Sequence, residues 1–374
     1  MELRVQGEME PPIERDWRHR LATGLHKSGV VRALQVLSRH CELAADHGGA
    51  GRLRRVRKPK YVVLGYHSIG AHGFPLYCRL PVRVFAEQMR YIKRHYRVLS
   101  LQQMVEELQN PNGHQQNVVV TFDDGYVGTY SDAFPILKEY GIPATVYLTA
   151  GAIESGEVPW YDRIFLQFQQ AASSLSLTLD GQRQFHLGSF WSRVDAAASV
   201  VSYLRTLPDE ERQRWCDSFE QAIPLCRTEL RGSMMNWEQI REMRHAGIAF
   251  GCHTMTHPVL SRLTPDAVRR EVGESKWLIE NRLGVQVENF AFPFGKPKDC
   301  GSIGADALSQ LGIRTALTTI VGVNEPGGNT FRLRRMVQGN ETSIAMFAYR
   351  LQRLFFHPLD EELDVAQDNG VQAY

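Results

Sequence analysis

The chain has 374 residues, a formal net charge of +2 and a hydrophobic share of 43%. Its length fits about two ordinary domains, or one α/β barrel of roughly 250 residues with additions. It is long enough to bury a sizeable core without disulfides or a structural metal, and its near-neutral charge excludes neither acidic nor neutral partners.

The cysteines and the N-terminus indicate a compartment. The six cysteines form no CxxC pair and no regular framework, which is typical of free thiols under reducing conditions. Acidic residues occupy the N-terminal stretch where a signal peptide would be apolar, and no run reaches membrane-spanning length. We therefore expect a cytoplasmic protein, with export by an unrecognised route as the alternative.

The first sixty residues differ from the rest. Apolar residues recur at helical spacing over 16–46, which predicts one helix or two with a break near Gly29, and a basic run follows at 52–60. A helical, basic extension over 1–60 has two open interpretations. The favoured one is a packed helix followed by a solvated linker; the other is peripheral contact with a membrane or a lipid-linked glycan. No aromatic residues interleave with the run, which argues against nucleic acid.

From residue 61 the pattern alternates between strands and helices. The expected strands are apolar runs at 61–66, 117–122, 144–150, 248–252, 288–293, 314–319 and 331–337. The expected helices lie at 82–94, 101–109, 130–140, 236–246, 265–283 and 303–311. Such alternation predicts an α/β fold with a mainly parallel sheet covered by helices.

A segment at about 155–232 interrupts this rhythm. The stretch 178–182 is typical of a hairpin turn, and 190–229 has a helical pattern. We interpret the segment as an inserted subdomain of helices and a hairpin, which either shapes substrate access or is a plain surface excursion. A C-terminal helix and tail are expected over 341–374.

Two adjacent carboxylates, Asp123 and Asp124, directly follow an expected strand, and two imidazoles, His253 and His257, follow another. Three such groups can bind a divalent cation while the fourth acts as a base, as a mononuclear metallohydrolase requires. If they take no part in a metal site, Asp123 and Asp124 would instead cap the next helix. The histidines are four residues apart, so a helical turn would place them on one face.

Other candidate residues also come at strand ends. His67 follows the strand at 61–66, and Pro293 and Phe294 follow the strand at 288–293. In barrel-like α/β folds the C-terminal ends of the strands converge on one mouth, so we expect these segments to meet there.

The motifs resemble those of a known family, the polysaccharide deacetylases of the NodB-homology group of carbohydrate esterases. Thr121–Tyr126 matches the motif T-F-D-D-G-Y, His253–His257 matches H-[ST]-x-x-H, and Phe290–Gly295 is similar to the third motif. Three motifs in order are far more specific than one. The resemblance covers about 61–340 without the insertion and implies a distorted (β/α) barrel of about seven strands.

The resemblance also implies residue roles. Asp124, His253 and His257 would bind a divalent metal, foremost Zn²⁺, with Co²⁺, Ni²⁺ or Fe²⁺ as alternatives. Asp123 would be the general base for an attacking water while the metal polarises the acetyl carbonyl. The backbone N–H of Phe294, after Pro293, would bind the developing oxyanion.

Two family features are missing from this chain. The third motif often has an arginine that holds the base aspartate, and Ala291 stands there instead. We expect Arg335 to orient Asp123 in its place, with Arg334 as the alternative.

The fifth motif usually supplies a histidine as general acid, which the region 331–336 lacks. A subgroup that includes exopolysaccharide deacetylases has an early Y-H motif, and Tyr66-His67 fits it. His67 is therefore expected to protonate the leaving amine, with a buried structural histidine as the alternative.

Trp160-Tyr161-Asp162 opens the insertion and resembles a W-[YWF]-D element of some relatives. Trp160 and Asp162 are expected at the substrate, the indole stacking on a sugar ring; packing of Trp160 against the barrel is equally open.

The leading hypothesis is a metal-dependent hydrolase that removes N-acetyl groups from sugars of a polysaccharide or its lipid-linked precursor, as in exopolysaccharide biosynthesis. Two alternatives remain open. One is an O-acetyl esterase or deformylase on the same metal centre, and the other is a non-catalytic carbohydrate-binding relative. The sequence indicates no oligomeric state.

Overall fold

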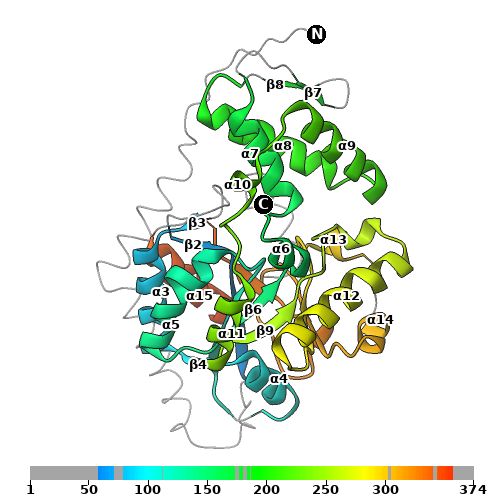
Figure 1. The fold of residues 1–374 in the computed structure, drawn as a ribbon. Helices are drawn as coiled ribbons and strands as arrows, with labels where there is room; N and C mark the ends of the chain where they lie inside the picture. The colour runs from blue at the N-terminus through cyan, green and yellow to red at the C-terminus, as the bar shows by residue number, and fades with distance from the viewer. Residues whose placement is uncertain are drawn as a thin grey trace, which may run out of the picture.

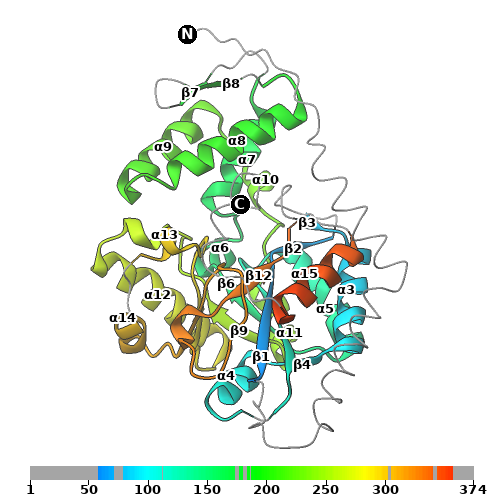
Figure 2. The same cartoon turned by 180° about the vertical axis from the view of Figure 1, so that it is seen from behind.

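Seven parallel strands follow one another in chain order around a nearly closed barrel (Figures 1 and 2). They are β1 (Lys60–Tyr66), β5 (Gln116–Phe122), β6 (Ala144–Leu148), β9 (Ala249–Cys252), β10 (Asn289–Ala291), β11 (Thr315–Leu317) and β12 (Arg335–Val337). β12 pairs back onto β1, and a bridge between Leu317 and Leu333 spans the remaining gap. The predicted distorted (β/α) barrel is confirmed.

The computed structural model describes residues 58–70, 79–111, 113–172, 177–179, 183–185, 187–301, 305–339 and 343–356. The helix expected within 16–46, most of the basic run at 52–60 and the turn residues 180–182 lie outside them. No helix in the described part of the chain combines the length and apolar character needed to cross a bilayer.

Helices cover the outside of the barrel. They are α3 (Val82–His95), α4 (Leu101–Gln109), α5 (Phe134–Tyr140), α11 (Trp237–His245), α12 (Pro265–Leu283), α14 (Ala305–Gln310) and α15 (Ile344–Phe356). Side chains of Ser100, Asn236 and Thr264 cap the first turns of α4, α11 and α12. Gly141 and Gly284 end α5 and α12 in the left-handed conformation that favours glycine.

Short elements complete the scaffold between these strands and helices. They are β2 (Ser68–Ile69), β3 (Arg79–Leu80), β4 (Arg97–Leu99), η1 (Thr129–Ala133), α6 (Ala150–Ser155), η2 (Leu260–Arg262), α13 (Pro297–Cys300) and η3 (Thr330–Arg332). β4 pairs with the first half of β5.

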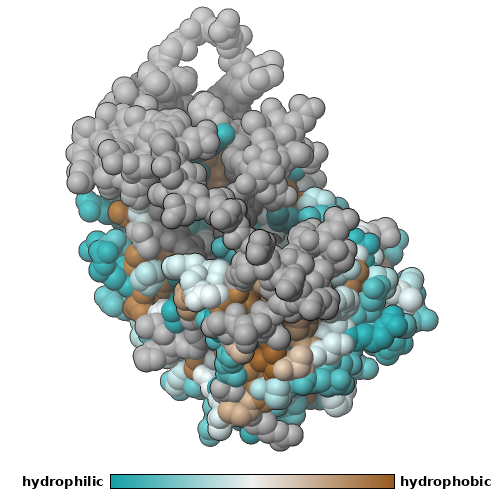
Figure 3. All heavy atoms as spheres, turned by 90° about the horizontal axis from the view of Figure 1, so that it is seen from above, coloured by the Kyte–Doolittle hydropathy of each residue, from teal (hydrophilic) through white to brown (hydrophobic). Residues whose placement is uncertain are grey.

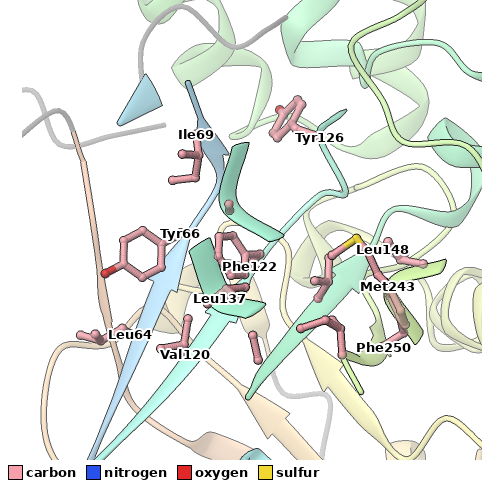
Figure 4. Packing of buried hydrophobic residues seen from close by; sticks show 14 of the residues in the cluster. Leu64, Tyr66, Ile69, Val120, Phe122, Tyr126, Leu137, Leu148, Met243 and Phe250 are labelled. Atoms are coloured by element: carbon pink, nitrogen blue, oxygen red, sulfur yellow. The ribbon is translucent and has the colours of Figure 1, made fainter. Parts of the chain in front are cut away.

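Alternate residues of each strand face two different cores. On β1, Val62 and Leu64 belong to the layer between sheet and helices, whereas Tyr61 and Val63 belong to the barrel interior. Figure 4 shows part of the outer layer, where side chains of β1, β5 and β6 pack together. This alternation follows from the two-residue repeat of a strand, and burial of both faces explains why the strands are apolar runs.

The insertion stands at one end of the barrel (Figure 1). It contains α7 (Trp160–Gln170), β7 (Leu177–Leu179), β8 (Arg183–Phe185), α8 (Phe190–Leu204), α9 (Asp209–Ala222) and α10 (Arg227–Leu230). The chain leaves and returns through a paired stem, where the Val158 N–H donates to the Leu230 carbonyl at 3.0 Å. α7, α8 and α9 share a hydrophobic core of their own. Viewed from this end, the described residues at the outer edge of the molecule are mostly hydrophilic (Figure 3).

The seven expected strands are present, and several of them are shorter than expected. The strand expected from residue 331 begins at Arg335, because Thr330–Arg332 form the 3₁₀ turn η3. The strand expected to end at 150 ends at Leu148, where α6 follows almost at once. The expected helix 130–140 begins as the π-helical turn η1.

Gly128 lies in a close approach to the segment that follows β1. A Cβ at this position would overlap the backbone carbonyl of Ile69, which lies two residues after His67. We predict that Gly128→Ala destabilises the protein by about 1–3 kcal/mol, because the backbone must shift to relieve the overlap. Urea unfolding would measure this. Gly188→Ala is the matched control, since its Cβ would meet nothing within 4 Å; equal costs would contradict the prediction.

Candidate metal centre

Asp124, His253 and His257 meet at the C-terminal end of the strands. The Nε2 atoms of His253 and His257 lie 3.5 and 3.4 Å from Oδ1 of Asp124. One ligand atom from each residue lies within 4.8 Å of the others, and all three residues are buried. The three side chains expected to ligate a metal therefore converge on one point.

The backbone is strained where these side chains turn inward. Within the described residues, the non-glycine residues with positive φ are Asp124 (70°), Thr254 (68°), His257 (57°) and Phe294 (59°). Each such conformation costs on the order of 1–3 kcal/mol and persists only where the surroundings enforce it. The turn at Asp124 explains how adjacent aspartates, which would face opposite sides of a strand, both reach the site.

The histidine loop is irregular. The sequence predicted a helical turn that would align His253 and His257, and this was wrong: residues 253–257 form no helix. Glu271 on α12 holds the loop instead, accepting hydrogen bonds from the N–H groups of Met255 at 2.9 Å and Thr256 at 3.0 Å. Left-handed residues in the loop then turn both imidazoles toward Asp124.

A backbone carbonyl orients the His253 imidazole, and Trp160 holds the backbone of His257. Nδ1 of His253 lies 2.7 Å from the carbonyl oxygen of Ala291, which can only accept, so Nδ1 carries the proton and Nε2 is free to ligate. The indole N–H of Trp160 donates to the His257 carbonyl at 3.0 Å. The contact of His253 is what a metal-binding histidine needs from its surroundings, whereas Nδ1 of His257 is buried without a hydrogen-bond partner.

The donor set fits a divalent cation. Oδ1 of Asp124 is buried without a hydrogen-bond partner, between the two imidazole nitrogens. Burial lowers the pKa of His253 to about 4 and that of His257 well below its usual value, so both rings are neutral near pH 7. Burial, Asp123 and Asp162 raise the pKa of Asp124 well above its usual range. A cation would satisfy the orphaned oxygen and both nitrogens.

Asp123 forms a buried bidentate ion pair with Arg335. Nη1 and Nη2 of Arg335 donate to Oδ1 and Oδ2 of Asp123 at 2.7 and 2.8 Å, and Nε donates to the Thr318 carbonyl at 2.8 Å. The expected Arg335 contact is present, whereas Arg334 donates to the Val321 carbonyl. Burial would raise the pKa of Asp123, but Arg335 and the facing imidazoles hold it well below its usual range.

His67 lies at the end of β1, as expected. Its Nδ1 is buried without a hydrogen-bond partner, although the residue as a whole is partly exposed. Burial lowers the pKa of His67 and so does Arg335, while Asp123 opposes them. The ring is therefore electrostatically coupled to the Asp123–Arg335 pair. Its role as general acid stays a prediction.

A residue of the insertion holds the loop that follows β10. Arg205, at the end of α8, places its guanidinium carbon 4.1 Å from the centre of the Phe294 ring and pairs with Asp299 at 2.8 Å. The Thr319 hydroxyl donates to the Phe294 carbonyl at 2.7 Å. These contacts keep Phe294, which follows Pro293, in its left-handed conformation. Substrate contact by either residue stays a prediction.

Trp160 and Asp162 are both buried in the first turn of α7. The Trp160 ring lies under the guanidinium of Arg212 at 4.8 Å and packs in the insertion core. Asp162 is fully buried and accepts a hydrogen bond from the Tyr126 hydroxyl at 2.7 Å. The Trp160 ring also packs against Phe294 of the loop after β10, with 6.3 Å between the ring centres, as expected if Trp160 packs the insertion against the barrel. Sugar contact by these two residues stays a prediction.

Sequence reasoning missed several residues that shape the site. They are Tyr126, Tyr161, Arg205 and Glu271. Tyr126 stands inside the motif that carries the aspartates, so its position was a usable signal. Tyr161 stands between two residues that were selected. Arg205 and Glu271 sit on helices far along the chain and had no local signal.

Comparison with known proteins gives a consistent result. A sequence model described as polysaccharide deacetylase matches residues 110–316. The chain is 24% identical over 285 residues to YxkH of Bacillus subtilis, whose name assigns it to the polysaccharide deacetylases, covering 75% of this chain and 73% of that protein. It is 33% identical over 72 residues to the poly-β-1,6-N-acetyl-D-glucosamine N-deacetylase of Staphylococcus epidermidis, covering 19% and 25%.

A solved structure shares the fold. It is that of the deacetylase PplD of Streptococcus pyogenes in complex with acetate, which superposes with a TM-score of 0.52 at 19% identity. The match covers 80% of this chain and 99% of that one. It supports the barrel architecture.

We predict that Arg335→Gln lowers the free energy of unfolding of the metal-free protein by about 3–5 kcal/mol at neutral pH, because Asp123 is left buried and unpaired. The folded pKa of Asp123 then rises above its unfolded value. The variant regains stability as the pH falls toward that raised pKa, and its deficit relative to wild type shrinks. Urea unfolding between pH 4 and 7 measures this. Arg97→Gln, which removes a partly exposed pair with Glu107, should cost about 1 kcal/mol or less; a deficit for Arg335→Gln that is constant with pH would refute the prediction.

Metal affinity should fall as the solution is acidified from pH 7 to pH 5. The imidazoles are already neutral in this range. Binding needs the ionised carboxylate, and burial and the neighbouring carboxylates raise the pKa of Asp124, so protons compete with the cation more strongly as the pH falls. Calorimetric titration of Co²⁺ in buffers of different ionisation enthalpy would report the released proton. An affinity that is independent of pH in this range would contradict the assignment.

Proposed function

Because the chain belongs to the polysaccharide deacetylase family, we propose that it hydrolyses the acetamido group of N-acetylated sugars with Asp123 as general base beside a divalent metal. Its relatives by sequence are polysaccharide deacetylases, which act as hydrolases on N-acetylated polysaccharide. The observation that carries the proposal is the buried pair of Asp123 and Arg335 next to the Asp124, His253 and His257 triad.

We propose Zn²⁺ as the metal, held by Asp124, His253 and His257, because two neutral imidazoles and one carboxylate are a common catalytic zinc set. Co²⁺, Ni²⁺ and Fe²⁺ suit the same donors. When bound, such an ion polarises an acyl carbonyl and lowers the pKa of water toward neutrality.

The protein's own residues supply the proton transfers. Asp123 accepts a proton from the attacking water, and Arg335 keeps the carboxylate ionised and aimed. The N–H of Phe294 is proposed to donate to the oxyanion, a contact worth about 3–4 kcal/mol of barrier in comparable sites. His67 is proposed to protonate the leaving amine. Burial lowers the pKa of His67, and the proton that it donates is balanced by the one that Asp123 removes from the water.

The departures from the family pattern support catalysis over a binding-only role. Ala291 replaces the usual arginine, yet Arg335 brings a guanidinium to Asp123 from another strand. A protein that only bound sugar would have no need to keep a buried, ionised base beside an orphaned metal ligand. We therefore favour the enzyme over the non-catalytic relative.

The substrate and setting are proposals as well. The similarity to a poly-β-1,6-N-acetyl-D-glucosamine N-deacetylase makes short β-1,6-linked N-acetylglucosamine oligomers the first substrates to test. We propose that the protein acts in the cytoplasm or at the membrane surface on a polysaccharide or a lipid-linked precursor.

Asp123→Asn should reduce kcat for acetate release by about 10²- to 10⁴-fold, the usual contribution of a general base, while the protein keeps its metal. Acetate and free amine would be measured together on N-acetylglucosamine oligomers with added Zn²⁺ or Co²⁺. The exposed Asp195→Asn on α8 is the control and should keep the wild-type rate.

Three outcomes would change the proposal. Acetate released faster from O-acetylated sugars, with no new amine, would favour an esterase. Full activity of Asp123→Asn would remove the assigned base. Wild-type protein that binds no divalent ion and releases no acetate would overturn the enzymatic role.

A further inference from the structure

We propose that Asp162, in the first turn of α7, is a positioning residue of the metal centre. Through the hydroxyls of Tyr126 and Tyr161 it holds Asp124 in place and strengthens binding of the divalent cation. The inference rests on the proposed function, because it requires Asp124 to be a metal ligand. It gives Asp162 a role at the metal in place of one at the sugar.

A series of neighbouring hydroxyl groups connects the carboxylate of Asp162 with that of Asp124. The Tyr126 hydroxyl donates to Oδ2 of Asp162 at 2.7 Å, and it lies 3.4 Å from the Tyr161 hydroxyl. Both hydroxyls also lie close enough to the Asp124 carboxylate to stabilise its charge. Each hydroxyl has one proton, so both carboxylates are satisfied when Tyr126 donates to Asp162 and Tyr161 donates to Asp124.

Burial makes this series of hydrogen-bonding groups rigid and keeps the substrate away from it. Asp162 is 0% exposed, Tyr126 1% and Tyr161 5%. A polysaccharide cannot reach the Asp162 carboxylate without displacing Tyr126. Tyr161 also packs against the metal-site histidine, with 4.8 Å between its ring centre and that of His257. The first turn of α7 therefore contacts two of the three proposed ligands.

The formal charges near the centre point the same way. Asp162 places a second buried carboxylate near Asp124, and a divalent cation would offset the repulsion between the two. In a buried site, a carboxylate one hydroxyl away from a ligand increases that ligand's basicity and favours the ion.

The test compares metal affinities of matched variants. Asp162→Asn should weaken Co²⁺ and Zn²⁺ binding to the full-length, metal-free protein by about 10- to 100-fold, as loss of such outer contacts does elsewhere. Tyr126→Phe removes only the hydroxyl and should also weaken binding, and it serves if the Asp162 variant folds poorly. Competition with a chelator gives the affinities, and the visible spectrum of bound Co²⁺ reports the ligand geometry.

Asp299→Asn is the matched control. Asp299 is also a buried aspartate beside the site, but its partner is Arg205 and it does not contact Asp124. It should leave metal affinity at the wild-type value. Urea unfolding of each metal-free variant separates loss of stability from loss of affinity.

The outcomes distinguish this inference from the proposed function. Wild-type protein that binds no divalent ion would overturn both. Wild-type binding with unchanged affinity in Asp162→Asn and Tyr126→Phe would overturn only the role of Asp162. A lower free energy of unfolding without a change in affinity would make Asp162 a structural residue. Equal weakening in Asp299→Asn would show a general effect of buried charge and also overturn the inference.

Discussion

The ion pair of Asp123 with Arg335 is the contact on which the rest of the site depends. It joins the end of β5 to β12 across β1, so the last strand of the barrel supplies the partner for the first site motif. Both side chains are shielded from water, and neither could be ionised there without the other. The barrel must therefore close around β1 before Asp123 can act as a base, which makes fold and chemistry interdependent.

Strain is concentrated where chemistry is proposed. The scaffold uses ordinary devices: capped helices, parallel strands in chain order and interdigitated apolar layers. All four non-glycine residues with positive φ in the described part of the chain belong to the aspartate, histidine and phenylalanine segments of the site. The contacts of Glu271, Trp160 and Arg205 stabilise two of those segments, so helices outside the strands offset the cost of bending them.

Local patterns predicted the alternating α/β fold and the position of the site residues at strand ends, and the family resemblance predicted the barrel. Apolar runs and glycine stops set the strands and helices, and Asp123, Asp124 and the histidines stand directly after strands. The helical turn at His253–His257 was wrong because spacing alone cannot reveal that Glu271 holds the segment as an irregular loop. No local sequence pattern pointed to Arg205, because its contact with Phe294 depends on how α8 packs over the barrel.

The insertion is not a detachable appendage. The paired stem at Val158 and Leu230 is an obvious place to delete the insertion. Such a deletion would remove the indole of Trp160 and the phenol of Tyr161, which contact His257. A minimal version of this protein would have to retain the opening turn of α7 and rejoin the chain beyond Asp162. Any shortening of this region is under the same restriction, so only the outer helices and the hairpin can be lost without removing these contacts.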